Sequence, residues 1–353
     1  MNLDDFASFQ SLDPQAMLAK IEGLPDQLKT AWELGQGLPL PKAGGIDRVV
    51  IAGMGGSAIG GDLLASYASS SCRVPVFIHR DYGLPAWAHG PGTLVIASSH
   101  SGNTEETLDS LETALQNQCQ VMTLSTGGVL ARRAAEHRIP LWQFDYSGQP
   151  RAAVGFSFGL LLAAFARLGL VPDPGAELAE AVAAMQEQQE SLLPPVRTAH
   201  NPAKRMAGQL VGRWINVFGS GLLASVARRW KTQLNEIAKA GAGFEVLPEA
   251  DHNALAGTLN PSEVLPRTYS IFLRAPSDHP RNRLRLELTK QSFMLEGLST
   301  DFHDALGKSA LAHIWTTLNF GDFTAYYLAM VYKVDPTPVT ALENLKTTLK
   351  ARA

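Results

Sequence analysis

Cysteine is scarce in this 353-residue chain, and blocks of a single charge are missing. The two cysteines, Cys72 and Cys119, cannot build a disulfide framework or a zinc cluster, and their scarcity is typical of a reducing cytoplasm. The net charge is −3 and no basic block is present, which argues against nucleic acid as the main partner. No group of residues has the spacing of metal ligands, so we expect no metal.

Long uninterrupted apolar runs are also missing. The most apolar stretch, residues 152–170, is interrupted by Ser157, Gly159 and Arg167, and it predicts a buried helix in a soluble domain rather than a membrane span. The N-terminus has no basic segment followed by an apolar region, so no export signal is predicted. We therefore expect a cytoplasmic protein without a membrane partner.

The length of the chain predicts two domains, because 353 residues is long for one hydrophobic core. A hydrophobic content of 45% with 18% charged residues is typical of a globular protein. We expect four segments: an N-terminal helical segment (1–45), a first domain (46–170), a proline-flanked linker around a Gln/Glu-rich helix (171–195), and a second domain ending in a helix (196–353).

In both halves, short apolar segments alternate with segments of helix length. We expect strands at residues 48–54, 74–79, 93–98, 120–125 and 139–144 in the first half, and at 213–218, 244–247, 268–274 and 298–302 in the second. Near-continuous apolar strands of this kind are typical of parallel sheets covered on both faces. The Gly53–Ser57 turn after the first strand is echoed by Gly219–Gly221 in the second half. The sequence therefore predicts an α/β fold of two doubly wound parallel-sheet domains in tandem.

A hydroxyl-rich turn, Ser-Ser-His-Ser-Gly-Asn-Thr-Glu-Glu-Thr, runs from Ser98 to Thr107 directly behind an apolar strand. It opens a helix, where the dipole and the unpaired N–H groups favour an anion. Ser99, Ser101 and Thr104 add hydroxyl donors, and the turn contains no Lys or Arg. It therefore suits a compact phosphate monoester better than a polyphosphate with its magnesium. Helix capping by Ser101 or Thr104 explains one of these hydroxyls, but not all of them.

The turn after the first strand allows a second interpretation. Gly53-Met54-Gly55-Gly56-Ser57-Ala58 fits a dinucleotide-binding fingerprint with Ala in the third place. Asp81 lies just past the second strand, near the place of the acidic residue that binds a ribose. NAD binding is therefore an alternative, although a lone glycine-rich turn is a weak signal and the hydroxyl-rich turn competes with it as an anion site.

Several motifs occur in an order that resembles one known family. The Gly53–Ser57 turn with Gly60-Gly61-Asp62, and the segment from Ser98 to Thr107, resemble the sugar-isomerase (SIS) domain that binds phosphosugars. Further motifs follow along the chain: Gln149-Pro150-Arg151-Ala152-Ala153, Gln233-Leu234-Asn235-Glu236-Ile237-Ala238-Lys239, His252-Asn253, and Val334-Asp335-Pro336-Thr337-Pro338-Val339 before Lys346. From about Asp47 to its end, the chain is similar to the bifunctional phosphoglucose/phosphomannose isomerases. The resemblance implies two SIS-type domains and sets NAD aside.

The resemblance also implies a role for each matching residue. Glu236 matches the base that moves a proton between C1 and C2 through an enediol(ate), and Arg151 matches the residue that steadies the enediolate charge. His252 matches the ring-opening acid/base, which this family takes from the partner subunit, so a homodimer is implied. Lys346 matches a lysine at the ring-opening region, although Lys350 lies one turn away. The implied phosphate cradle is Ser57, Ser99, Ser101 and Thr104, with the backbone of Gly55 and Gly56 close to the substrate.

Alternatives stand beside these roles. Without the family match, Glu236 is a surface residue paired with Lys239 one turn along its helix. A phosphosugar-binding regulator without catalytic activity is an alternative function, although no helix-turn-helix segment or basic arm is visible. The chain departs from its relatives at His100, Ile237 and Ala254, and these departures bear on substrate preference.

The activity implied by the resemblance is an aldose–ketose isomerisation. It interconverts glucose 6-phosphate and mannose 6-phosphate with fructose 6-phosphate, and it needs neither a metal nor a nucleotide cofactor. The two aldoses differ only in the configuration at C2. Because an enediol(ate) erases that stereocentre, one base can serve both substrates if the C2–C3 bond can rotate in the site.

Overall fold

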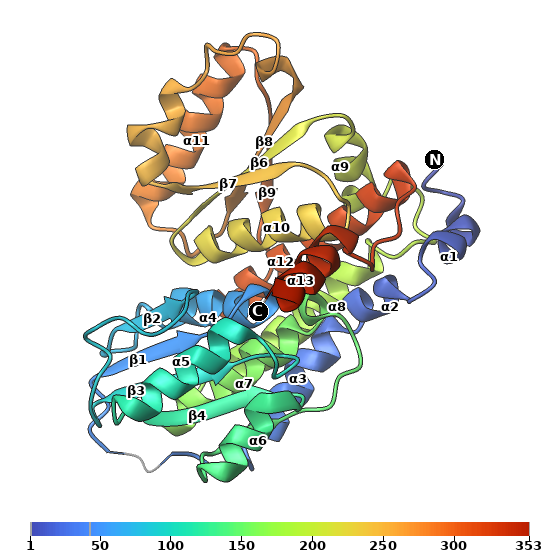
Figure 1. Cartoon of the computed structure of the whole chain (residues 1–353). Helices are drawn as coiled ribbons and strands as arrows, with labels where there is room; N and C mark the ends of the chain where they lie inside the picture. Colours follow the sequence, from blue (N-terminus) through green and yellow to red (C-terminus); the bar gives the residue numbers. More distant parts are fainter. Residues whose placement is uncertain (1, 42–43, 353) are drawn as a thin grey trace.

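The computed structural model describes residues 2–41 and 44–352 (Figure 1). Its first sheet consists of five short parallel strands. The strands are β1 (Arg48–Ala52), β2 (Val76–His79), β3 (Thr93–Ser98), β4 (Gln120–Ser125) and β5 (Leu141–Gln143), in the order β2-β1-β3-β4-β5. Strand β3 is buried along its whole length, as its apolar sequence predicts for a central strand. The helices that follow β1, β3, β4 and β5 are α4 (Gly55–Ala68), α5 (Glu105–Gln116), α6 (Gly128–Glu136) and α7 (Val154–Arg167).

The second sheet repeats the same winding with four parallel strands. It is built from β6 (Trp214–Ser220), β7 (Ala242–Leu247), β8 (Thr268–Arg274) and β9 (Ser299–Asp304), in the order β7-β6-β8-β9. Its helices are α9 (Pro202–Leu210), α10 (Ala224–Glu236), α11 (Pro280–Leu295) and α12 (Ala310–Tyr332). In each sheet the first strand lies between the second and the third. The predicted α/β fold with two doubly wound parallel sheets is confirmed.

Helices outside the two sheets pack against both domains. The N-terminal segment forms η1 (Phe6–Ser8), α1 (Phe9–Leu12), α2 (Met17–Glu22) and α3 (Leu24–Gly35). Helix α8 (Gly175–Glu190) occupies most of the segment expected to be the linker, and it packs against α3 on one side and α12 on the other. The division into domains at residues 45, 170 and 195 stays a prediction.

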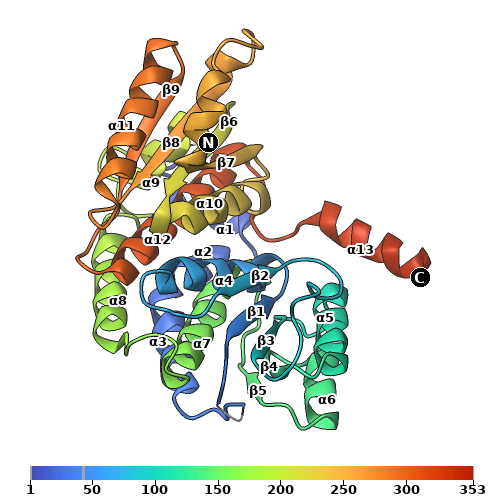
Figure 2. The same ribbon diagram turned by 90° about the vertical axis from the view of Figure 1, so that its left-hand side faces the viewer.

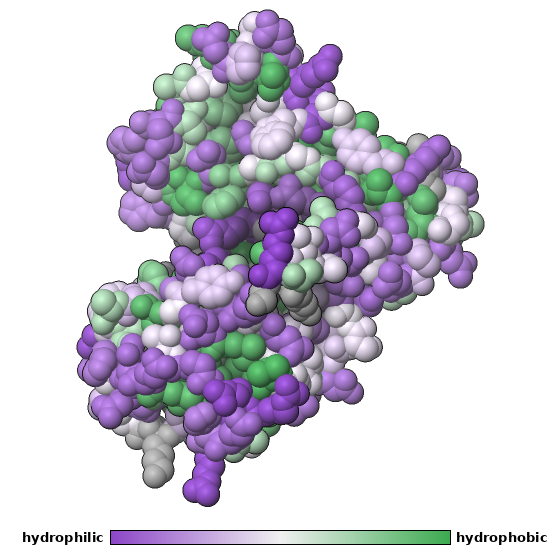
Figure 3. All heavy atoms as spheres, viewed as in Figure 1, coloured by the Kyte–Doolittle hydropathy of each residue, from purple (hydrophilic) through white to green (hydrophobic). Residues whose placement is uncertain are grey.

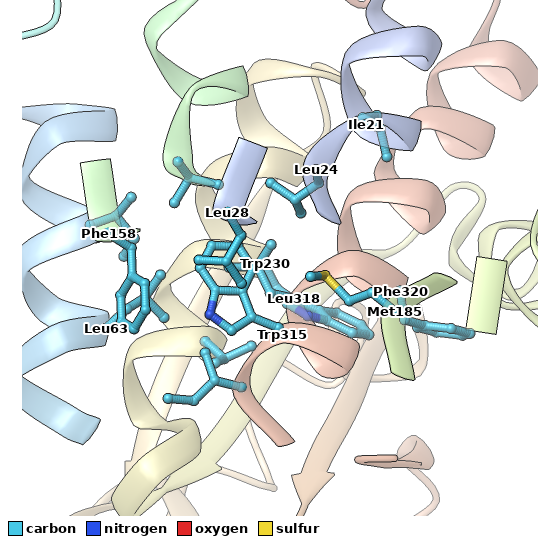
Figure 4. Close-up of a cluster of buried hydrophobic side chains, with 14 of the residues drawn as sticks. Ile21, Leu24, Leu28, Leu63, Phe158, Met185, Trp230, Trp315, Leu318 and Phe320 are labelled. Atoms are coloured by element: carbon cyan, nitrogen blue, oxygen red, sulfur yellow. The ribbon is translucent and has the colours of Figure 1, made fainter. Parts of the chain in front are cut away.

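One continuous apolar core joins the two domains (Figure 4). Phe158 on α7 meets Trp315 on α12 edge to face, with 5.2 Å between the ring centroids. Trp230 on α10 is buried in the same cluster, and its indole N–H donates to the carbonyl oxygen of Thr317 at 2.9 Å. Burial of such aromatic side chains is among the larger stabilising contributions in a core. The domain that carries α10 is therefore held firmly against the domain that carries α7.

Two helices at opposite extremes of burial complete the fold. Helix α7 forms within the predicted apolar stretch and is buried over nearly its whole length. Among residues 2–41 and 44–352, no helix combines the length and the apolar character that crossing a membrane requires. Helix α13 (Thr340–Arg352) instead projects away from the rest of the chain (Figure 2). Its leucines Leu342, Leu345 and Leu349 are all exposed.

Candidate active site

The two turns singled out from the sequence lie at neighbouring strand ends. The glycine-rich turn follows β1 and the hydroxyl-rich turn follows β3, and these strands pair directly. The connection after β1 leads to β2 at one edge of the sheet, and the connection after β3 leads to β4 on the other side. The carboxyl ends of β1 and β3 therefore border a topological switch point, which is where α/β folds bind ligands. Helix α4 begins at Gly55 and α5 at Glu105, so the N-termini of two helices open at this place.

The hydroxyl groups of these turns accept hydrogen bonds from the protein. Ser57 Oγ accepts from the backbone N–H of His100 at 3.1 Å, and Ser101 Oγ accepts from the N–H of Asn103 at 3.2 Å. Ser99 Oγ and Thr104 Oγ1 are 2.9 Å apart and share one hydrogen bond. A hydroxyl that accepts from a backbone N–H keeps its own proton to donate. The hydroxyls of Ser57 and Ser101 therefore each keep a proton that they can donate.

The expected capping role of the turn hydroxyls is not what the structure shows. Thr104 does occupy the N-cap position of α5, with an extended backbone, but its side chain makes no capping hydrogen bond. Its hydroxyl is engaged by Ser99 instead. Ser101 bonds to the N–H of Asn103, which precedes the helix. Capping as part of the explanation was wrong, because the side chains bond across the turn rather than along the helix axis.

Close backbone packing holds the two turns in place. Gly102 has a φ of +66°, and a Cβ built on it would lie 1.9 Å from the carbonyl oxygen of Gly127. A Cβ built on Gly56 would lie 2.5 Å from the carbonyl oxygen of Pro150. No side chain fits at either position without movement of the backbone. The start of α4 therefore lies directly against η2 (Pro150–Ala152), which carries Arg151.

Arg151 and Glu236 meet between the two domains. Arg151 Nη1 lies 3.5 Å from Glu236 Oε2, at the C-terminal end of α10. The Arg151 side chain is 4% exposed and that of Glu236 is 29% exposed. Arg151 Nη2 donates to the carbonyl oxygen of Pro336 at 2.9 Å and also to that of Thr337. Burial lowers the pKa of the Arg151 guanidinium, and the charge of Glu236 acts in the opposite direction. The structure therefore brings together two of the residues expected to be catalytic.

The simple pairing of Glu236 with Lys239 does not form. Lys239 follows the end of α10 with a φ of +55°, and its ammonium donates to the carbonyl oxygen of Glu236 at 2.7 Å rather than to its carboxylate. The carboxylate is left to face Arg151. Desolvation, followed by the positive charge of Arg151, lowers the pKa of Lys239 to about 8. Lys239 thus adds a titratable cation beside the site, which the sequence analysis had treated only as a surface partner.

His252 and Lys346 lie apart from this pair within one chain. His252 ends η4 (Glu249–His252), beyond β7, and is exposed. Lys346 is exposed on the projecting helix α13, and the side chain of Lys350 lies outside the described part of the structure. Over the described residues, no hydrogen bond or ion pair joins His252 or Lys346 to Arg151 or Glu236. The structure therefore brings the start of α4, Arg151 and Glu236 together, but not these two residues.

The three departures from the family have different surroundings. Ile237 is fully buried and packs in the apolar core. The ring of His100 lies edge-on to Phe144 and Tyr146, at 5.9 Å from each ring centroid, and desolvation lowers its pKa. Ala254 begins η5 (Ala254–Ala256), beside His252. Of the three, only His100 lies within the hydroxyl-rich turn, Ser98–Thr107.

Sequence analysis missed two buried charges next to Arg151. Arg229 on α10 donates to the carbonyl oxygen of Arg151 at 2.8 Å, and it also pairs with Asp322 on α12. A signal for Asp322 was present: α12 has 23 residues and Asp322 is its only Asp, Glu, Lys or Arg. A single charge inside a long apolar helix indicates a buried partner.

A cavity of about 630 Å³ lies elsewhere and is not this site. It is lined by residues of the N-terminus and α9, among them Asp4, Lys204 and Gln209. Lys204 is fully buried there and donates to the carbonyl oxygens of Pro194 and Val196, so its charge is already satisfied within the chain. In one view of the surface, an indentation separates the two lobes of the molecule (Figure 3).

Comparisons with known proteins match nearly the whole chain. Residues 199–349 match the model of the bacterial phospho-glucose isomerase C-terminal SIS domain. The bifunctional phosphoglucose/phosphomannose isomerase of Caldicellulosiruptor bescii is 37% identical over 94% of this chain and 98% of its own length. That of Aquifex aeolicus is 32% identical over 86% of this chain and 91% of its own length.

A solved structure supports the fold over the whole chain. A hypothetical protein of Thermus thermophilus superposes with a TM-score of 0.74, covering 99% of this chain and 96% of that one, at 16% identity. The SIS fold, the ordered motifs and the extent of the sequence identity agree with one another. The chain belongs to the bifunctional phosphoglucose/phosphomannose isomerase family.

Proposed function

We propose that this protein interconverts glucose 6-phosphate and mannose 6-phosphate with fructose 6-phosphate. The observation that carries the proposal is the 3.5 Å contact between Arg151 and Glu236, formed by two domains beside an anion-binding turn. A carboxylate, a fixed guanidinium and an anchor for phosphate are the groups that proton transfer in a phosphosugar requires.

The phosphate binds at the carboxyl ends of β1 and β3. Ser57 and Ser101 donate hydroxyl protons to its oxygens, and so does the member of the Ser99–Thr104 pair whose proton is not used in their shared hydrogen bond. The first N–H groups of α4, at Gly55 and Gly56, add backbone donors. The sugar then extends toward η2 and the end of α10, because Gly56 lies directly against Pro150.

Glu236 transfers the proton between C1 and C2. Its carboxylate is partly exposed and can reach a substrate, whereas its helix is held by the core. Arg151 stabilises the negative charge that develops on the enediolate oxygen, a role suited to a guanidinium fixed by the carbonyl oxygens of Pro336 and Thr337. One planar intermediate leads to both aldose products, because rotation about the C2–C3 bond turns either face of C2 toward Glu236, and protonation of each face gives one epimer.

Ring opening requires a second subunit. His252 is exposed and lies apart from Glu236 in its own chain, so we place it in the site of a partner copy. Helix α13 supports a dimer, because three exposed leucines line a helix that otherwise projects into solvent. Lys346 on the same helix joins the ring-opening region. We place the reaction in the cytoplasm, where the free thiols of Cys72 and Cys119 remain reduced.

The direct test supplies purified protein with fructose 6-phosphate and measures both aldose 6-phosphates. Formation of both products supports the proposal, and formation of glucose 6-phosphate alone removes the mannose part. If fructose 6-phosphate binds but neither product forms, the protein is a phosphosugar-binding regulator and the proposal is wrong.

Mixing two inactive variants tests the shared site. In a mixed dimer of Glu236→Gln and His252→Ala subunits, one site carries both defects and the other carries none. Mixing after reversible dissociation is expected to restore roughly a quarter of wild-type activity, since half of the dimers are mixed and each has one intact site. Activity that stays at the level of the separate variants would show that each site is built from one chain.

A further inference from the structure

Arg229 occupies the same face of α10 as the proposed base. Arg229, Gln233 and Glu236 lie at i, i+4 and i+7, so their side chains leave the helix in similar directions. Arg229 and Gln233 are each 1% exposed, whereas Glu236 lies at the open end of the row. The position of Arg229 is therefore rigidly related to that of Glu236 through two turns of one helix.

The guanidinium of Arg229 joins three elements. Its Nη2 donates to the carbonyl oxygen of Arg151 in η2 at 2.8 Å and to Asp322 Oδ2 in α12 at 2.8 Å, and its Nε donates to Asp322 Oδ1 at 3.3 Å. The Asp322 side chain is only 5% exposed. Desolvation raises the pKa of Asp322, and the charge of Arg229 opposes that shift.

Stability alone does not explain a buried pair of this kind. Replacing buried ion pairs by well-packed apolar side chains is often neutral or stabilising, because burial removes the hydration of both charges. The neighbours of this pair in sequence, Trp230 and Phe323, are buried in the apolar core. What an apolar replacement would lack is the hydrogen bond to the carbonyl oxygen of Arg151.

We propose that the Arg229–Asp322 pair positions Arg151 for catalysis. The proposal rests on the function given above. Asp322 orients the Arg229 fork, and the fork holds the main chain of Arg151 to α10, the helix that ends in Glu236. Gly56 packs against η2 from the phosphate side. One helix thereby sets both ends of the 3.5 Å contact between Arg151 and Glu236, and the contact keeps its place relative to the phosphate turns. Arg229 and Asp322 are positioning residues, since they act through Arg151.

The test removes both charges together, so that neither is left unpaired. The double variant Arg229→Met with Asp322→Leu is expected to keep its thermal midpoint within a few degrees of the wild type. Its kcat for fructose 6-phosphate should fall about 10- to 100-fold, since small displacements of catalytic groups have effects of that size. KM should change less than about threefold, because the phosphate turns are untouched. A merely structural role would not separate kcat from KM in this way.

Hydrogen exchange measures, without any reaction, how firmly Arg229 holds η2 to α10. The amides of Ala152 and Ala153 donate to the carbonyl oxygens of Gln149 and Pro150 within and beside η2. Both amides should exchange faster in the double variant, whereas amides of β3 should be unchanged. If the wild-type protein proves inactive, the proposed function fails, and this exchange measurement still decides whether the pair holds η2.

Two further variants keep the test decisive. Arg229→Lys retains the charge opposite Asp322 but loses the planar fork, so it is expected to fold and to lose kcat to an intermediate extent. Arg228→Met is the matched control, because Arg228 lies next in the same helix and pairs across the domains with Asp62 at 3.2 Å. Its kcat should stay near the wild-type value. Wild-type kcat and wild-type exchange at Ala152 and Ala153 in the double variant would overturn the proposal, as would an equal loss of kcat in Arg228→Met.

Discussion

The two sheets have the same order of their first three strands, yet different groups lie at the carboxyl ends of their central strands. Between β1 and β3, Ser57 and Ser101 accept hydrogen bonds from backbone N–H groups and keep their own protons for a ligand. Between β6 and β8, the carboxylate of Asp278 accepts from the N–H of Ala275 at 2.7 Å and from the hydroxyl of Ser220 at 3.4 Å. Desolvation raises the pKa of Asp278. In the second domain, the chain's own carboxylate therefore accepts from the donors at the strand ends, whereas in the first domain Ser57 and Ser101 keep protons that they can donate.

This difference shows how one architecture supplies two different parts of a site. The first domain contributes its crevice, and the second contributes the C-terminal end of the helix after β6, where Glu236 lies. Topology fixes where a crevice can form, but the side chains at the strand ends decide whether it is open. We propose phosphate binding for the first domain and proton transfer for the second, and each assignment can be tested.

The largest effect is expected from Glu236→Gln, which removes the base contributed by the second domain. Loss of a general base typically lowers rates by roughly 10²- to 10⁴-fold, and we expect kcat to fall in that range for both aldose products. KM for fructose 6-phosphate should stay within about threefold, because the anchor belongs to the first domain. Steady-state kinetics check this, with the exposed Glu296→Gln as control. Retained activity for either epimer would contradict a single shared base.

A smaller effect, on binding, should separate the two crevices. Ser99→Ala removes one partner of the Ser99–Thr104 pair in the open crevice. Hydrogen bonds to charged groups contribute about 1.5–3 kcal/mol, so KM should rise roughly tenfold or more. Ser220→Ala makes the matched change in the closed crevice and should leave KM unaltered. A similar rise in KM for both variants would remove the distinction between the crevices.

Backbone approach provides a third comparison. Added Cβ atoms would lie 2.5 Å from a carbonyl oxygen at Gly56, in the first domain, and at Gly219, in the second. Both alanine variants should therefore lose about 1–3 kcal/mol of unfolding free energy, because the backbone must shift. Only Gly56→Ala should also raise KM several-fold, since it displaces the start of α4 from η2. Chemical denaturation with parallel kinetics measures both effects, and an equal KM for the two variants would contradict the assignment.

The smallest effect is expected from Asp278→Asn, and it depends on pH. The raised pKa of Asp278 means that the folded state binds more protons than the unfolded state just above the ordinary value of 3.8. The contribution of Asp278 to stability therefore falls as the pH rises through that window, and it stays low above the raised pKa. Asn lacks this titration, so the stability of the variant relative to the wild type should improve as the pH rises from about 3.5 to 6. Thermal unfolding at several pH values measures this, and kinetics should be unchanged. A difference that is independent of pH would show that Asp278 is not desolvated as described.

Much of the fold could be read from local sequence. The strands at residues 93–98, 120–125 and 268–274 form with the expected bounds, and the turn after β3 lies where its hydroxyl pattern predicts. The expected bounds of the edge strand β5 were less accurate, because it spans only Leu141–Gln143 within the expected 139–144. Apolar periodicity and turn residues act over a few neighbouring positions, so they identify central strands best.

The sequence by itself determined the two sheets, the place of the hydroxyl-rich turn after β3 and, through ordered motifs, the family. Only the tertiary structure decided that Glu236 faces Arg151 rather than Lys239, and that Thr104 bonds across its turn instead of capping α5. Asp322 and Arg229 are 93 residues apart in the chain, and Arg151 is held by carbonyl oxygens 185 and 186 residues away. Hydrogen bonds of this kind depend on how whole elements pack, whereas local patterns record only the choice of helix, strand or turn. The arrangement of charges around the site therefore belongs to the packing of the two domains against each other.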